Sequence, residues 1–356
     1  MSKIIKMGIV GLGRIGRPMA TREINQYPDK FHVVAACDLI PERAEQIAKL
    51  YEGCREYTDY AEMLKQEDID LVYICTRSCD HYKHALMAFE AGKDVLLEKP
   101  VTVSYEQAAD LYRRFNKAGA PLLYVHQQRR LESAFTAVKA AMDSGKLGRV
   151  YEVNTSQNSF QHRDDWQTLS EFGGGQLLNW GPHIIDQSLQ FLGTKIFDVQ
   201  SYLTQATAGG DCEDHLRIRF IGDNNRVVNM CISGGMALHT GRYFEVFGDR
   251  GAAVYEGGKL SLRYINPEQE IPPVVSSPDT PGAAFGKSGT YQSSLVIDWK
   301  TEELQVAEAG PELANFWALL YDSLENGAEF PITDEDILAI MRTISTVKAQ
   351  NKYIMK

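Results

Sequence analysis

Hydrophobic and polar positions follow two different patterns along the chain. In the first part, short apolar runs alternate with stretches of helical spacing. The runs predict strands at residues 6–10, 31–37, 69–75, 93–97 and 121–125. The helical spacing predicts helices at residues 16–26, 41–51, 59–65, 81–92 and 104–119. Strands and helices that alternate through short connections are typical of an α/β fold with a doubly wound parallel sheet, which we place at residues 1–125.

The pattern changes in residues 126–356. After a helix at 131–144, apolar and polar positions alternate between Gly, Asp and Asn turns. These segments predict strands at residues 150–154, 195–204, 215–220, 226–233, 243–248 and 252–256. We therefore predict a second α/β domain with a large open, mostly antiparallel sheet, whose uncovered face is a surface for a homodimer or homotetramer. Residues 264–310 are expected to form a long loop, and closing helices at 311–325 and 334–351 could pack back on the first domain.

The charge balance argues against two classes of partner. The chain has 37 Lys and Arg against 47 Asp and Glu, a net charge of −10, whereas nucleic acids and anionic membranes require a basic face. No apolar run approaches the roughly 20 residues of a membrane span, and the N-terminus has no signal-peptide core. The six cysteines form no CxxC pair and no zinc set, so we expect reduced thiols, no metal and a cytoplasmic protein.

A glycine-rich motif follows the first predicted strand. Gly11, Gly13 and Gly16 have G-x-G-x-x-G spacing, with Arg14 and Ile15 between the last two. In this strand–turn–helix context, the first glycine makes the turn, the second lets the backbone approach a pyrophosphate, and the third lets the helix pack on the strand. The motif therefore predicts a Rossmann-type dinucleotide site. The alternative is a glycine-rich turn without a ligand.

An acidic residue ends the second predicted strand. Asp38 lies 22 residues after Gly16, the spacing at which a carboxylate meets the adenosine ribose hydroxyls. A carboxylate there repels a 2′-phosphate, so NAD is favoured over NADP, although the nearby Arg43 leaves NADP open. The alternative role for Asp38 is to cap the following helix.

Two further stretches are the candidates for chemistry. Glu98-Lys99-Pro100 ends a buried strand, where a parallel sheet binds its ligands. The segment 173–186 has three glycines, then Pro182 and His183 at a helix start. The positive end of a helix favours a neutral imidazole, which suits a base. Asp186 is a same-face neighbour three residues later, and we expect it to orient the ring. The glycines allow close approach of a ligand or of another backbone.

Together these motifs resemble the Gfo/Idh/MocA family of nicotinamide-dependent oxidoreductases, named for glucose–fructose oxidoreductase and inositol dehydrogenase. The resemblance covers essentially the whole chain. It rests on residues 11–16, on Cys75-Thr76 with His81, on residues 91–100 and on residues 173–186. It implies a Rossmann domain that binds NAD(P), then an α/β domain whose sheet forms dimers or tetramers.

The resemblance also implies residue roles. Lys99 polarises the reacting oxygen and His183 accepts the proton, which agrees with the need to remove a hydroxyl proton beside a positive charge. The cofactor residues are expected to be Gly11, Gly13, Arg14, Ile15, Gly16, Asp38, Thr76, Arg77, His81, Glu98 and Lys99. The catalytic and substrate residues are expected to be Lys99, Asn179, His183, Asp186, Arg129, His162, Arg163 and Trp166, with Arg130 a further lining candidate.

The chain departs from the family pattern at two positions. Many members have Asp where this chain has Asn179, and Asn cannot hold an imidazolium by charge, so Asp186 could take that task. The family's Thr-Pro-Asn loop reads Thr76-Arg77-Ser78 here, and Arg77 could favour an acidic or phosphorylated ligand. Each substrate-loop residue could instead be a loop anchor.

Three functions are consistent with these residues. The first is an NAD(P)-dependent dehydrogenase or reductase acting on a secondary hydroxyl or ketone of a sugar, inositol or glycoside. The second is a glycoside-cleaving enzyme that uses bound NAD in a transient oxidation. The third is a non-catalytic nucleotide-binding regulator, which would have little need of both Lys99 and His183.

Overall fold

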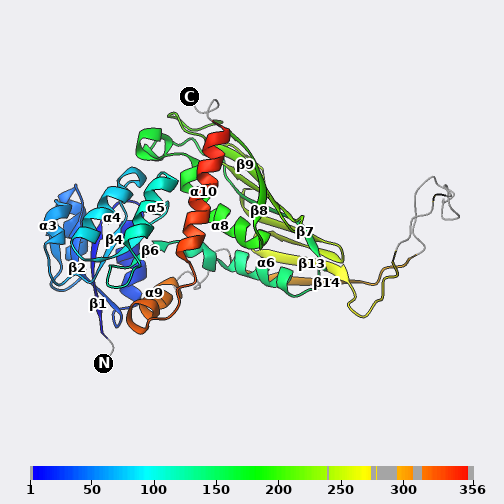
Figure 1. The fold of residues 1–356 in the computed structure, drawn as a ribbon, viewed down its shortest axis with the longest axis horizontal. Coiled ribbons are helices and arrows are strands. Elements are labelled where there is room, and N and C mark those ends of the chain that lie inside the picture. Colours follow the sequence, from blue (N-terminus) through cyan, green and yellow to red (C-terminus); the bar gives the residue numbers. More distant parts are fainter. Residues whose placement is uncertain (1–2, 239, 274–277, 279–294, 308–314, 352–356) are drawn as a thin grey trace.

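The computed structural model of this chain describes residues 3–351 except 239, 274–277, 279–294 and 308–314. Figure 1 shows two α/β parts beside each other, one built on the strands β1–β6 and the other on a longer sheet of β7–β14. The red helix α10 stands where the two parts meet.

The first sheet is parallel throughout. Its strands are β1 (Ile5–Val10), β2 (Phe31–Cys37), β3 (Arg55–Tyr57), β4 (Leu71–Ile74), β5 (Asp94–Glu98) and β6 (Leu123–His126). Their order is β3-β2-β1-β4-β5-β6, so the strand order reverses between β1 and β4, the point where such sheets bind ligands. The strands are short apolar runs because helices cover both faces; all four residues of β4 are buried. The predicted doubly wound parallel sheet is confirmed.

The helices of this part follow the predicted order. They are α1 (Gly16–Pro18), α2 (Pro41–Ala48), α3 (Tyr60–Leu64), α4 (His81–Glu90) and α5 (Tyr105–Arg114). Asp59 caps α3 and Ser104 caps α5 with side-chain oxygens. The predicted continuous helix at 16–26 is wrong: after α1 the chain forms the π-helix η1 (Met19–Glu23) and a 3₁₀ turn, η2 (Ile24–Gln26).

The second sheet has eight strands in the described part of the chain. They are β7 (Val150–Asn158), β8 (Ile196–Thr204), β9 (His215–Gly222), β10 (Val227–Ser233), β11 (Gly241–Gly248), β12 (Gly251–Glu256), β13 (Lys259–Ile265) and β14 (Trp299–Gln305). Their order is β14-β13-β12-β11-β7-β10-β9-β8, and only β7 and β10 run parallel to each other among these pairs. The large, mostly antiparallel sheet is confirmed.

The expectation of one long loop at 264–310 is wrong for residues 299–305. These residues form β14, an edge strand paired with β13. Six of its seven residues are exposed, so the strand depends on backbone pairing and leaves no apolar alternation to find in the sequence. Most of the rest of that expected loop lies outside the described residues.

Helices cover one face of the second sheet and return to the first part. The helices are α6 (Ser133–Asp143), α7 (Gln176–Asn179), α8 (Gly181–Leu192), α9 (Asn315–Asn326) and α10 (Asp334–Gln350). α6, α8 and α10 pack on the second sheet. α9 packs on the first, where the ring of Trp317 lies 5.6 Å from Phe31 and 5.8 Å from Tyr73. Within the described residues, no helix has both the length and the apolar content needed to cross a bilayer.

Candidate active site

The turn after β1 has the geometry of a dinucleotide-binding loop. Gly11 has a φ of 88°, and a Cβ there would lie 2.6 Å from the backbone of Cys75. A Cβ on Gly16 would lie 2.1 Å from the carbonyl oxygen of Gly11, so the helix start packs directly on the turn. Gly13 has no atom within 4 Å of its Cβ position, which leaves its backbone open to a pyrophosphate. The loop therefore fits the predicted nucleotide.

Asp38 joins this loop to the end of β2. Its Oδ2 accepts a hydrogen bond from the Leu12 amide (2.7 Å), and its Oδ1 accepts one from the Ile40 amide (2.9 Å). The guanidinium of Arg43 lies 3.6 Å from Oδ1. The carboxylate therefore holds the turn after β2 and lies against the glycine loop, where an adenosine ribose would approach. The alternative role, capping the following helix, is wrong, because the N-cap of α2 is Ile40 and no side chain caps that helix.

The loop after β4 makes its side-chain contacts with protein. Thr76 Oγ1 lies 3.0 Å from His84 Nδ1. The His81 ring lies between the carbonyl oxygens of Pro100 (2.7 Å) and Thr76 (3.1 Å), and burial lowers the pKa of His81. Since both oxygens only accept, a neutral ring can donate to just one of them. Arg77 lies over the Phe172 ring at 4.4 Å, so it links the two parts of the molecule.

Glu98, predicted to bind cofactor, turns its side chain into the first sheet. Its Oε1 accepts hydrogen bonds from the Tyr73 hydroxyl (2.5 Å) and from His126 Nδ1 (2.6 Å). Burial alone would raise the pKa of Glu98, but His126, Lys99 and Tyr73 together lower it below its usual value. The buried carboxylate therefore keeps a negative charge next to Lys99.

Lys99 crosses from the first sheet to the second part. Its Nζ donates to the carbonyl oxygen of Asn179 at 3.0 Å and lies 3.4 Å from the Asn179 Oδ1. The Lys99–Pro100 peptide is cis, and β5 ends at Glu98 as predicted. Burial lowers the pKa of Lys99 to about 8; Glu98 opposes this shift, whereas Arg129 and Arg163 add to it. The amine is therefore a proton donor that titrates near neutral pH.

His183 lies in the first turn of α8, after Pro182. Burial, then the charge of Lys99, lower the pKa of His183 well below its usual value, so the ring is neutral at pH 7. Asp186 does not orient the His183 ring. The Asp186 carboxylate accepts a hydrogen bond from Arg130 Nε at 2.8 Å, and His183 Nδ1 is buried without a hydrogen-bond partner among the described residues. The expected Asp186–His183 contact is therefore wrong.

The three glycines before α7 bring other protein atoms together. A Cβ on Gly174 would lie 2.7 Å from the carbonyl oxygens of Gln167 and Leu169, and one on Gly175 would lie 2.5 Å from the Glu213 carboxylate. The sequence left two interpretations of these glycines, close approach of a ligand and close approach of another backbone. The structure shows close approach of protein atoms. This packing fixes the start of α7, whose last residue, Asn179, receives Lys99.

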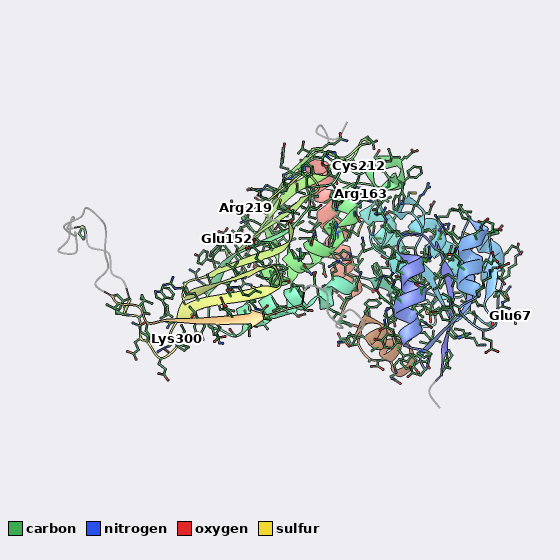
Figure 2. The ribbon with its side chains drawn as sticks, turned by 180° about the vertical axis from the view of Figure 1, so that it is seen from behind. Glu67, Glu152, Arg163, Cys212, Arg219 and Lys300 are labelled. Carbon is green, nitrogen blue, oxygen red and sulfur yellow. The ribbon has the colours of Figure 1, made fainter. Side chains whose placement is uncertain are left out.

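In the predicted substrate loop, Arg163 is the residue that connects to the glycine loop. Arg163 binds Asp165 at 2.8 Å, and Asp165 in turn binds Arg14 of the glycine loop at 2.9 Å. Figure 2 places Arg163 between the large sheet and the first part. His162 is exposed against the Phe160 ring at 5.4 Å, away from these contacts. Trp166 begins the 3₁₀ turn η5 (Trp166–Thr168).

Arg129 and Arg130 follow β6 and diverge. Arg129 lies over the ring of Trp180 at 4.4 Å and donates to Glu132 at 2.8 Å, which places it beside the start of α8. Arg130 pairs with Asp186 instead. The structure thus brings Lys99, Asn179, His183, Arg129 and Arg163 to one region between the two parts.

Sequence reasoning missed several contacting residues. Asp165 and Gln167 connect the substrate loop to Arg14 and to Asn179, and Tyr73 and His126 bind Glu98. None of these has a motif, because each partner lies in a different element. In the described residues, no group of three or more His, Cys, Asp or Glu could hold a metal ion.

Comparison with known proteins agrees with this arrangement. Residues 5–126 match the family model described as "Oxidoreductase family, NAD-binding Rossmann fold", and residues 135–254 match the GFO/IDH/MocA C-terminal domain. The uncharacterized oxidoreductase YhhX of Escherichia coli is 25% identical, over 94% of this chain and 93% of its own. The scyllo-inositol 2-dehydrogenase (NADP(+)) IolW of Bacillus subtilis is 23% identical, over 98% and 94%.

A solved structure shares the whole fold. The NAD-binding protein from Listeria innocua superposes with a TM-score of 0.78 at 23% identity, covering 98% of this chain and 97% of its own. The two family models together cover both sheets up to β12. The chain belongs to the Gfo/Idh/MocA family of NAD(P)-dependent oxidoreductases.

Proposed function

We propose that this enzyme transfers a hydride between nicotinamide and a secondary hydroxyl or ketone of a sugar, inositol or glycoside. The observation that carries the proposal is the hydrogen bond from Lys99 Nζ to the Asn179 carbonyl oxygen, 3.0 Å long, because it brings the amine of the first part to the helix start that holds His183. The relative named as a scyllo-inositol 2-dehydrogenase supports a polyol substrate.

The two groups have different tasks in this proposal. Bound NAD(P) supplies the hydride acceptor or donor. The Lys99 ammonium donates a hydrogen bond to the reacting oxygen and stabilises negative charge that develops there. His183 is neutral, because burial and Lys99 lower its pKa, so it is ready to take the hydroxyl proton during oxidation.

The test combines a substrate panel with two variants. The protein is incubated with NAD⁺ or NADP⁺ and a set of inositols, hexoses and glycosides, and absorbance is followed at 340 nm. We expect turnover that Lys99→Ala and His183→Ala each reduce by about 100-fold or more while NADH still binds. Lys65→Ala, an exposed lysine of the first part, is the control.

Other outcomes point to the other functions. Glycoside cleavage without net NADH would favour the transient-oxidation mechanism. NADH binding with no reaction on any compound, unchanged in both variants, would favour a regulator and overturn the proposal.

We also propose that copies of the chain associate through the uncovered face of the second sheet. Arg219, Asn154 and Glu245 lie across that face in register, so it carries both signs of charge and can complement a second copy. Figure 2 shows Arg219 and Glu152 out along the sheet. Light scattering should show a dimer or tetramer that Arg219→Glu weakens; a monomer at all concentrations would refute this.

The six free cysteines support a cytoplasmic location.

A further inference from the structure

A charged cluster beside the start of α8 has no task in the chemistry proposed above. It contains Arg129, from the 3₁₀ turn η4 (Gln128–Leu131), Arg242 at the start of β11, and Glu132. Arg129 Nη1 donates to Glu132 at 2.8 Å, and the Arg242 Nε lies 3.5 Å from the same carboxylate. The side chain of Glu132 is 2% exposed and that of Arg242 is 8% exposed, so the cluster is largely shielded from water.

One carboxylate in this cluster faces two guanidinium groups, which leaves a net positive charge. The other hydrogen-bond partners of Arg242 in the described part of the chain are neutral: the Ser156 carbonyl oxygen at 3.1 Å and the Gln187 side chain. Its Nε is buried and has no hydrogen-bond partner among the residues that the structure describes. Burying a cation without full neutralisation is costly, and burial accordingly lowers the pKa of Arg242 to about 10. Among the described residues, the cluster therefore has one positive charge more than its carboxylate balances.

This excess positive charge lies close to the reacting groups, because Arg129 lies over the Trp180 ring at 4.4 Å and that ring lies 6.0 Å from the His183 ring. After burial, the charges that lower the pKa of His183 include those of Lys99, Arg129 and Arg242. Arg129 is the accessible member, because its side chain is 27% exposed and lies over Trp180, which neighbours α8. The pyrophosphate of the cofactor has a separate place at the glycine loop, where Gly13 leaves the backbone open.

We propose that the substrate of this enzyme carries an anionic group, a carboxylate or a phosphate, next to the reacting hydroxyl, and that Arg129 binds that group. Arg242 is a positioning residue: it shares Glu132 with Arg129 and so leaves the Arg129 charge available to the ligand. This inference rests on the proposed function and narrows it to acidic or phosphorylated sugars and polyols.

The experiment uses compounds that share a sugar ring and differ at C6, where they carry a neutral hydroxymethyl group, a carboxylate or a phosphate. Glucose, glucuronate and glucose 6-phosphate, with the galactose series beside them, are compared by kcat/KM and by their binding to the enzyme–NADH complex, followed by NADH fluorescence. We expect an anionic member to exceed its neutral partner by about tenfold or more, since charge-assisted hydrogen bonds are that strong. The carboxylate and phosphate arms show which anion is bound.

The variants separate binding from folding. Arg129→Gln should lower the anionic-to-neutral ratio about tenfold, Arg129→Lys should restore much of it, and Arg242→Gln should lower it less. Arg149→Gln, which removes an exposed arginine of the second part with a 73% exposed side chain, should leave the ratio unchanged.

Failure of this inference and failure of the proposed function give different results. Turnover of neutral compounds at equal or higher kcat/KM would overturn the anionic site and retain the dehydrogenase. Anion binding that depends on Arg129, without any turnover, would retain the site and overturn the dehydrogenase. An anionic-to-neutral ratio that Arg129→Gln does not change, or no binding of any anionic compound, would overturn the site.

Discussion

At the scale of single residues, Lys99, His183 and Asp186 show that local signals place a side chain in its element without determining which group it contacts. Lys99 and His183 were found because each follows a local signal, a strand end before proline and a helix start after proline. Asp186 was placed beside His183 on helical spacing, yet Arg130 binds it. Helical spacing shows only that Asp186 and His183 share one face of a helix. Arg130, the partner of Asp186, lies 56 residues upstream, so no local pattern could identify it.

The buried lysine makes stability depend on pH in a direction that can be checked. The pKa of Lys99 falls from 10.5 to about 8, so the folded state disfavours the ammonium. This cost is fully present below pH 8 and disappears above the unfolded pKa. Lys99→Met should therefore raise the free energy of unfolding by up to about 3 kcal/mol at pH 7, and by less than about 1 kcal/mol at pH 10.

Urea unfolding at the two pH values measures this difference. Lys65→Met serves as the control, because the side chain of Lys65 is 68% exposed and we expect no such pH dependence. An equal effect of Lys99→Met at pH 7 and pH 10 would show that Lys99 is not held in a desolvated site.

At the scale of elements, the apolar runs predicted most strands, including the edge strands β6 and β8, and missed β3, β13 and β14. β2 was predicted with its observed bounds, since all but one of its residues are buried. β3 and β14 were missed because they are short or mostly exposed edge strands, held by backbone hydrogen bonds that any side chain permits. The π-helix η1 was also missed, because residue spacing does not show which carbonyl oxygen accepts the hydrogen bond of each backbone amide.

Gly175 and Gly13 have opposite surroundings: Gly175 is packed against protein atoms, whereas Gly13 faces open space in the nucleotide loop. A Cβ on Gly175 would meet the Glu213 carboxylate at 2.5 Å, and its φ is 95°. Gly175→Ala should therefore cost about 2 kcal/mol or more and displace α7 with Asn179. The Cβ atom that Gly13→Ala adds would have no atom within 4 Å. This substitution should preserve the melting temperature and weaken NADH binding about tenfold or more.

Thermal unfolding and NADH titration of the two variants, side by side, check this contrast. If Gly13→Ala binds NADH as well as the natural chain, the open space at Gly13 is not where the pyrophosphate lies. If Gly175→Ala is as stable as the natural chain, the loop around Glu213 is softer than its contacts indicate.

At the scale of the whole molecule, a series of polar contacts connects the two parts. Arg14 binds Asp165, Asp165 binds Arg163, and Arg163 binds Gln167. The Gln167 amide then lies 3.4 Å from the Asn179 Oδ1, beside Lys99. The sequence indicated both ends of this series, the nucleotide loop and Lys99. The contacts between these ends depend on how the two domains meet, and no segment of one domain encodes that alone.

Asp165→Asn tests whether this series positions Lys99 or only holds the domains together. The Arg14–Asp165 pair has side chains 60% and 32% exposed, so removing its charge should change the free energy of unfolding by less than about 1 kcal/mol. Because Arg163 and Gln167 would lose their anchor, we expect kcat to fall about tenfold while the melting temperature stays within a few degrees. The neighbouring exposed Asp164, changed to Asn, is the matched control. A parallel loss of kcat and stability would mean that Asp165 is only structural; an unchanged kcat would mean that Lys99 is held by Asn179 without help from the nucleotide loop.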